Sequence, residues 1–186
     1  MTDFFPANEI CNTDFSSFTA FDIETTGLAR NSNIIEIGAV KVKNVVIKYS
    51  FNELVDPQML IPSRITYITG ITNKMVSGCD TIDKVLPRFA QFAGDDILLG
   101  HNNVSFDCPI IRHWANMYGI YIGNDVFDTL RHLKYRCQPF PDMTSKSLEN
   151  LCTYFNIQAD IHHRASADAE ITAKLYFILK KNSVPK

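Results

Sequence analysis

The sequence lacks the usual marks of a secreted, membrane-bound or zinc-binding protein. Its five cysteines are odd in number and scattered, with no Cys-x-x-Cys pair and no spacing typical of zinc ligands. Residues 1–18 contain no basic segment followed by an apolar core and a small-residue cleavage site. We therefore expect reduced thiols, no signal peptide, no membrane span and a cytoplasmic protein.

An excess of positive charge is also missing. Eighteen lysine and arginine residues stand against twenty aspartate and glutamate residues, which gives a formal net charge of −2. Such a balance does not favour binding of extended duplexes through long-range attraction to phosphate. It remains compatible with local binding of a few phosphate groups, because bound metal ions would supply positive charge locally.

No low-complexity segment, linker or internal repeat divides the 186 residues. The hydrophobic share of 46% and the charged share of 20% are ordinary for a globular protein long enough to bury a sheet between helices. We predict an N-terminal lead-in over residues 1–17 and a single domain over residues 18–186.

The first half of the domain is rich in predicted strands. Apolar runs cover residues 18–23, 34–42 and 45–54, and a tight turn at Lys43-Asn44 is predicted between the last two. Runs joined in this way indicate an antiparallel meander.

Strands alternate with helices in the second half. The predicted segments are a helix at 81–92 with a kink or late start at Pro87, a short strand at 95–99, a helix at 109–118, a strand at 125–127, a helix from 129 to about 137, a helical stretch at 148–155 and a helix at 166–181 with Ser166 as its N-cap. A meander followed by such alternation predicts an α/β fold with a mixed sheet covered by helices.

The first acidic pair lies on the first predicted strand. Asp22 and Glu24 are two positions apart, so their carboxylates point to the same face, while Phe21 and Ile23 point into the core. Two acids this close favour a cation between them. Solvated acids at a strand end are the alternative interpretation of this segment alone.

A second cluster, residues 101–107, follows a short apolar strand and leads into a helix. Loops at the carboxyl ends of strands commonly carry the functional sites of α/β proteins. Asp107 would lie near the start of that helix, where interaction with the helix dipole is an alternative explanation for an acid.

A third cluster spans residues 163–169. Asp168 would also lie in a first helical turn, but it stands three and seven positions before Ile171 and Leu175 and so shares their inward-facing stripe. An acid on a buried face needs a partner, and a metal ion would serve.

Together, the four acids predict a site for hard divalent cations. Carboxylate oxygens without cysteine or zinc-spaced histidine suit Mg²⁺ or Mn²⁺. Four carboxylates can hold two such ions about 3.5–4 Å apart, which activate a water and stabilise a leaving oxygen during phosphodiester cleavage. His163, five residues before Asp168, is then placed to accept the proton of that water.

With these three clusters in this order, residues 17–181 resemble the DEDDh exonucleases, the DnaQ-like group that includes the epsilon subunit of bacterial DNA polymerase III. Residues 34–40 and 68–72 are similar to the second strand and the substrate-side loop of that group. The resemblance implies a ribonuclease H-like fold and a 3′→5′ exonuclease that acts on single-stranded DNA and releases nucleoside 5′-monophosphates.

The resemblance also implies roles for individual residues. The metal ligands would be Asp22, Glu24, Asp107 and Asp168, the general base would be His163, and the substrate-binding residues would be Thr25, Thr26, Gly27, Leu28, His101, Asn102 and Phe106. Leu28 would act as an apolar wedge against the terminal base. For Phe106, a place in the core beneath its helix is the preferred interpretation.

Three other functions stay open at this point. The same motifs occur in exoribonucleases and oligoribonuclease-like enzymes, so RNA is an alternative substrate. A haloacid-dehalogenase-like phosphatase has a similar first strand, and Gly94-Asp95-Asp96 is similar to its acidic loop. That interpretation leaves the clusters at 101–107 and 163–169 unexplained. The third alternative is an inactive nuclease-like binding module. Residue types suited to catalysis stand at all five catalytic positions, which argues against it.

The expected partner is the 3′ end of a single DNA strand. The chain ends at Lys186, soon after the last predicted helix, so we expect a free-standing exonuclease, with a polymerase partner possible but not implied by a C-terminal tail.

Overall fold

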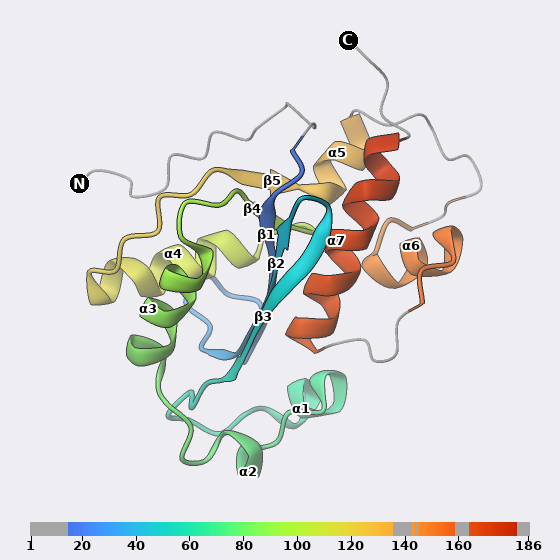
Figure 1. The fold of residues 1–186 in the computed structure, drawn as a ribbon. Helices are drawn as coiled ribbons and strands as arrows, with labels where there is room; N and C mark the ends of the chain where they lie inside the picture. Colours follow the sequence, from blue (N-terminus) through green and yellow to red (C-terminus); the bar gives the residue numbers. More distant parts are fainter. Residues whose placement is uncertain (1–14, 136–142, 144, 159–163, 182–186) are drawn as a thin grey trace.

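The computed structural model describes residues 15–135, 143, 145–158 and 164–181. Within these residues, five strands form a single sheet in the order β3-β2-β1-β4-β5. Helices cover both faces of this sheet (Figure 1). No helix in the described part of the chain is long and apolar enough to cross a membrane.

The sheet is mixed, as the sequence predicts. Its central strand β1 (Phe18–Thr25) pairs antiparallel with β2 (Ile34–Lys43) and parallel with β4 (Leu98–Gly100). Outside them, β3 (Val46–Leu54) pairs antiparallel with β2, and β5 (Val126–Asp128) pairs parallel with β4. The predicted α/β class with a meander and parallel strands is confirmed.

Seven helices are described. They are α1 (Ser63–Thr69), α2 (Asn73–Val76), α3 (Ile82–Ala93), α4 (Asp107–Tyr118), α5 (Thr129–Tyr135), α6 (Leu148–Phe155) and α7 (Ala165–Lys181). Helix α7 covers one face of the sheet and α3 and α4 cover the other, while α1 and α2 lie below the sheet in the view of Figure 1.

Strand β1 sends alternate side chains into two separate cores. Phe21 is buried with residues of α3 and α4 on one face. Ala20 is buried with Tyr176 of α7 on the other. Because side chains alternate along a strand, Asp22 and Glu24 lie on the same face as Ala20 and therefore point toward α7. Because of this alternation, the carboxylates of Asp22 and Glu24 face α7 and not α3 or α4.

Helix α7 begins in direct contact with β2. A Cβ atom added to Gly38 would lie 2.0 Å from the backbone nitrogen of Ser166 and 2.1 Å from the carbonyl carbon of Ala165, so only glycine leaves room for this approach. Farther along α7, the small side chains of Ala169 and Ala173 are buried. The first turn of α7 is therefore pressed onto the sheet beside β1.

Several predicted boundaries are wrong. The hairpin turn falls at Asn44 and Val45, which have φ values of 51° and 68°, one residue later than predicted. Helix α4 starts at Asp107, so Pro109 lies at its third position, where a missing N–H costs no helical hydrogen bond. The strand predicted at 95–99 is observed at 98–100, and that predicted at 125–127 at 126–128.

Helix ends and short helices account for the other errors. Helix α7 begins at Ala165, so Ser166 lies inside the helix and is not its N-cap. Pro87 lies within α3, which starts at Ile82, so a late start is wrong; the flanking Leu86 is buried in the core. Helices α1 and α2, of 7 and 4 residues, are too short for a periodic pattern. The predicted end of α5 near residue 137 lies outside the described residues.

Candidate active site

Three carboxylates meet on the α7 face of the sheet. Asp22 and Glu24 reach from β1 and Asp168 from the first turn of α7, and one oxygen of each lies within 4.8 Å of the others. The side chains of Asp22 and Glu24 are partly buried. Asp168 is only 8% exposed, which confirms that it faces inward. Two segments more than 140 residues apart in the sequence thus form one acidic cluster.

Asp107 joins this region from the other edge of β1. Strand β4 is short and pairs with β1 only at Thr19 and Ala20, so the edge of β1 beyond them is open to a side chain. There, the backbone N–H of Ile23 donates to Oδ1 of Asp107 at 3.2 Å. Asp107 is 3% exposed. The fourth predicted acid is therefore bonded to the residue between Asp22 and Glu24.

Burial and mutual repulsion disfavour the charged forms of these acids. Burial, followed by the nearby Asp107, Glu24 and Asp168, raises the pKa of Asp22 well above its usual range. Burial, followed by Asp168 and Glu36, raises the pKa of Glu24 to about 8, although Arg164 acts in the opposite direction. Burial raises the pKa of Asp107 to about 7 against the effect of its backbone hydrogen bonds.

The donor set fits a hard divalent cation. Its ligand atoms are carboxylate oxygens, which Mg²⁺ and Mn²⁺ prefer, and the repulsion among them is what a cation would relieve. Asp22, Glu24 and Asp168 are the residues suited to hold it, with Asp107 close enough to raise the pKa of Asp22. Crowded acids of this kind are typical of functional sites.

The raised pKa of Glu24 predicts a stabilising substitution. Its pKa of about 8 in the fold exceeds the ordinary 4.5, so ionisation costs the metal-free protein stability as pH rises from 4.5 through 8. In excess chelator at pH 8, Glu24→Gln is expected to raise the free energy of unfolding by about 1–3 kcal/mol, and by much less at pH 5. Urea denaturation at both pH values measures the difference.

The control for the Glu24 substitution is Glu149→Gln, at an exposed position of α6. A Glu24→Gln protein no more stable than wild type at pH 8 would contradict the repulsion described.

Asp128 is a structural residue that the sequence analysis missed. It is 2% exposed at the end of β5. Its carboxylate accepts from the backbone N–H groups of Asn102 at 3.0 Å and Val104 at 3.3 Å, and from those of Leu130 at 2.9 Å and Arg131 at 3.3 Å. It therefore ties the loop that leads to Asp107 to the start of α5. The available signal was an acid directly after an apolar strand and before a helix, a common capping position.

The loop after β1 presents Leu28 to solvent. Leu28 is 87% exposed. The loop is closed by a bond from the backbone N–H of Thr26 to the carbonyl of Asn33 at 2.8 Å, and the hydroxyl of Thr25 donates to the carbonyl of Gly27 at 2.6 Å. The predicted substrate residues 25–28 thus form a bonded loop at the same end of β1 as the acids.

The predicted substrate residues at 101–106 differ in their surroundings. The ring nitrogens of His101 lie 2.9 Å from the Thr129 hydroxyl and 2.9 Å from the Lys146 carbonyl, and burial lowers the pKa of His101. Asn102 is exposed, with a φ of 64°. Phe106 is partly buried against the core beneath α4, as preferred from the sequence. His163 lies outside the described residues.

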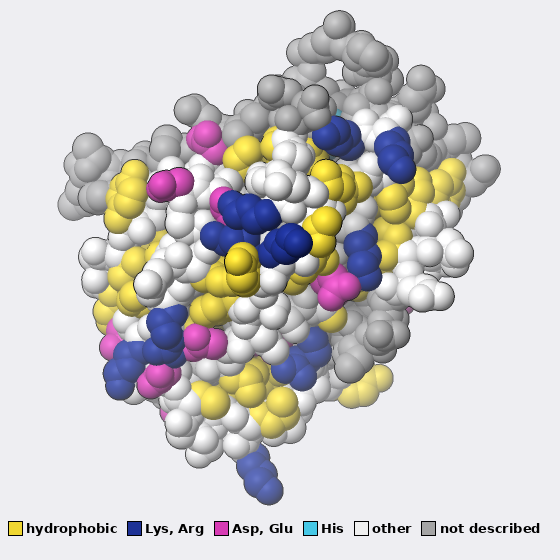
Figure 2. Space-filling model, viewed as in Figure 1, with side chains coloured by type: hydrophobic (Ala, Val, Ile, Leu, Met, Phe, Trp, Pro, Cys, Tyr) yellow, Lys and Arg dark blue, Asp and Glu magenta, His cyan; other side chains and the backbone are white. Residues whose placement is uncertain are grey.

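A cavity of about 530 Å³ opens beside this loop. His101, Asn102, Lys134, Lys146 and Ser147 are among its lining residues. Elsewhere, the face seen in Figure 2 shows lysine and arginine side chains interspersed with aspartate and glutamate, without a field of one sign. This distribution agrees with the small net charge.

The acidic loop of the phosphatase alternative lies away from these carboxylates. Asp96 is bonded to the hydroxyl of Thr19 at 2.9 Å and to Lys43 and Lys41 at 2.5 and 3.1 Å. Thr19 stands near the start of β1, whereas Asp22 and Glu24 stand toward its end. The charge of Asp96 is therefore used in ion pairs at the opposite end of the strand, and Asp95 is exposed.

Comparisons with known proteins agree on one class. A family model described as "Exonuclease" (RNase_T) matches residues 19–176. DNA polymerase III PolC-type from Caldanaerobacter subterraneus is 42% identical over 163 residues, which cover 86% of this chain and 11% of that protein. DNA polymerase III subunit epsilon from Aquifex aeolicus is 36% identical over 162 residues, which cover 86% of this chain and 78% of the subunit. The chain thus spans about one ninth of that PolC-type relative.

Solved structures show the same fold. E. coli Exonuclease I in complex with a dT13 oligonucleotide has a TM-score of 0.77 at 21% identity and covers 90% of this chain and 42% of its own. Exonuclease X in complex with 5′ overhanging duplex DNA has a TM-score of 0.71 at 25% identity and covers 88% of this chain and 91% of its own.

Proposed function

The chain belongs to the exonuclease family, and from this premise we propose that it is a metal-dependent 3′→5′ exonuclease that releases nucleoside 5′-monophosphates from single-stranded DNA. The observation that carries the proposal is the meeting of Asp22, Glu24 and Asp168 within 4.8 Å. Asp107, bonded to Ile23, completes the set of four acids. A family of hydrolases and an all-carboxylate site are together what phosphodiester cleavage requires.

In the proposed mechanism, Asp22, Glu24, Asp107 and Asp168 would hold two divalent cations, Mg²⁺ or Mn²⁺. Such ions, when bound, supply charge stabilisation for the scissile phosphate and the leaving oxygen. His163 accepts a proton from the attacking water. The water oxygen forms a bond to phosphorus as the bond to the 3′ oxygen breaks. The leaving 3′ oxygen takes a proton from solvent, which gives a 3′-hydroxyl on the shortened strand and a free nucleoside 5′-monophosphate.

The loop after β1 supports the choice of a strand end as substrate. In the proposal, Leu28, which is 87% exposed, packs against the terminal base, and residues 25–27 contact the same nucleotide. Asn102 and His101 would lie along the strand, with Lys134 and Lys146 near its phosphates. An apolar contact with a base is available to any unpaired end, so single strands should be preferred. A polymerase context is proposed only from the PolC-type relatives.

One degradation assay tests polarity and substrate together. Linear single-stranded DNA labelled at its 5′ end should shorten stepwise from the 3′ end and release nucleoside 5′-monophosphates, while closed circular single strands should survive. Cutting of the circles would identify an endonuclease and contradict the role of the terminal nucleotide. Faster degradation of a matched RNA or of dinucleotides would favour the exoribonuclease alternative, because recognition of the 2′-hydroxyl separates the two substrates. Release of phosphate from a simple phosphomonoester alone would favour a phosphatase.

A further inference from the structure

Glu36 is a buried acid beside the acidic cluster that the proposed mechanism does not use. It lies on β2 directly opposite Glu24 and has 0% exposure. Both of its carboxylate oxygens are engaged by the start of α7. The guanidinium of Arg164 approaches Oε1 at 3.1 and 2.5 Å and Oε2 at 3.1 Å, and the backbone N–H of Ala165 donates to Oε2 at 3.0 Å. Glu36 is therefore paired within the protein, and we do not include it among the proposed metal ligands.

These bonds act on the turn that carries Asp168. The carbonyl of Arg164 accepts the backbone N–H of Asp168 at 3.0 Å, the first helical hydrogen bond of that turn. Glu36 thus bonds Arg164, the residue whose carbonyl accepts the first hydrogen bond of α7. Two positions along β2, on the same face of the strand, Gly38 allows the backbone of Ser166 to lie against the sheet. Glu36 thus bonds the start of α7 to β2, and Gly38 sets how closely that start approaches β2.

We propose that Glu36 and Arg164 are positioning residues, which set the place of Asp168 in the metal site. This inference rests on the proposed function, because that function assigns Asp168 its role as a metal ligand. The carboxylate of Asp168 must meet Asp22 and Glu24, which stand on a different element. A forked ion pair on a buried carboxylate is suited to this task because its geometry is defined by several charge-assisted hydrogen bonds. Residues that orient metal ligands commonly control metal affinity in this way.

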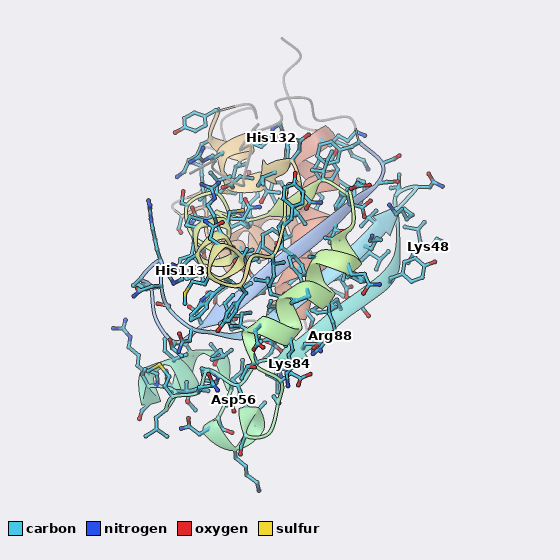
Figure 3. All side chains as sticks on the ribbon, turned by 90° about the vertical axis from the view of Figure 1, so that its left-hand side faces the viewer. Lys48, Asp56, Lys84, Arg88, His113 and His132 are labelled. Carbon is cyan, nitrogen blue, oxygen red and sulfur yellow. The ribbon has the colours of Figure 1, made fainter. Side chains whose placement is uncertain are left out.

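The chain offers a matched control pair. Arg88 of α3 forms the same forked contact with Glu53 of β3, at 3.0, 3.1 and 2.5 Å. Figure 3 shows Arg88 on α3, in front of the sheet, with α7 behind it. Arg88→Gln therefore removes a forked pair on the opposite face from the acidic cluster, together with the contact of Arg88 with Asp80 at 2.9 Å. If such pairs serve stability alone, Arg164→Gln and Arg88→Gln should have the same kinds of effect.

The test measures Mn²⁺ binding by calorimetry and the kinetics of full-length variants on single-stranded DNA. Arg164→Gln should weaken Mn²⁺ binding about tenfold and lower kcat on the order of 10²-fold with little change in KM. Arg88→Gln should lower the melting temperature but leave both quantities near wild type. Because Arg164→Gln leaves Glu36 buried without its cation, Arg164→Lys provides a variant that retains charge and fold. It should recover part of the Mn²⁺ affinity and of kcat, since an ammonium group cannot form the fork.

The possible results separate the two proposals. Folded Arg164→Gln and Arg164→Lys proteins with wild-type Mn²⁺ affinity and kcat would overturn the positioning role, as would an equal loss in Arg88→Gln. A wild-type protein without nuclease activity would instead contradict the proposed function. The Mn²⁺ titrations would still test in that case whether Arg164 positions Asp168.

Discussion

Replacing Asp22 by alanine is expected to lower kcat by on the order of 10³-fold or more, because it removes a proposed metal ligand from the acidic cluster. A tenfold loss in rate corresponds to about 1.4 kcal/mol of transition-state stabilisation. One carboxylate oxygen of Asp22 lies within 4.8 Å of ligand oxygens of both Glu24 and Asp168. The same substitution removes a carboxylate whose pKa is raised by burial and repulsion, so the metal-free variant should be no less stable than wild type. Single-turnover cleavage of an end-labelled strand measures the loss.

The matched control for this substitution is Asp95→Asn. Asp95 is exposed and stands in the segment that the phosphatase alternative would use as its acidic loop. It should retain nearly full activity. Excess chelator should abolish cleavage by wild type, and Mg²⁺ or Mn²⁺ should restore it. Undiminished nucleotide release in chelator, or an Asp95→Asn loss as large as that of Asp22→Ala, would contradict the assignment of the metal ligands.

The second large effect is expected at the proposed general base. His163→Ala should fold and bind both metal and DNA almost normally while kcat falls on the order of 10²–10⁴-fold, the usual scale for proton-transfer catalysis. An ordinary histidine pKa near ~6.5 suits acceptance of a proton near neutral pH. A histidine that only packs beside α7 predicts the opposite pattern, namely lost stability with retained chemistry. Rapid-quench kinetics and thermal denaturation of the same protein distinguish the two.

The neighbouring histidine provides the control for that experiment. His162→Ala should keep most of its activity, because only the histidine five residues before Asp168 matches the family motif. The acidic limb of the pH–rate profile should be altered in His163→Ala and retained in His162→Ala, after correction for metal occupancy. Near-normal cleavage by His163→Ala would remove this residue from the mechanism. An equal loss in both variants would leave the base unassigned.

The acids were predictable because their evidence is local. Asp22 and Glu24 share a face by the alternation of one strand, and Asp168 shares an inward stripe by the period of one helix. The order of the three motifs then predicted the family. The resemblance to DnaQ-like exonucleases is confirmed by the family match over residues 19–176 and by the epsilon-subunit relative. The ribonuclease H-like architecture is confirmed by the solved exonuclease structures.

The supporting residues were not predictable in the same way. Asp128 accepts bonds from a loop 24 to 26 residues earlier, and Glu36 pairs with Arg164 at a separation of 128 residues. No pattern along one element signals such a partner, because the pairing exists only after β2 and α7 have packed together. Gly38 was visible as a glycine in a strand, yet its reason, the close approach of Ser166, is also a property of the assembled fold.

The most direct measurement of the central claim is the anomalous diffraction of crystals soaked with Mn²⁺ and a nucleoside 5′-monophosphate. We expect two Mn²⁺ peaks within the cluster of Asp22, Glu24, Asp107 and Asp168, with the nucleotide phosphate bound beside them. Mn²⁺ bound elsewhere on the protein with this cluster empty, or a nucleotide bound away from it, would contradict the two-metal exonuclease site proposed here.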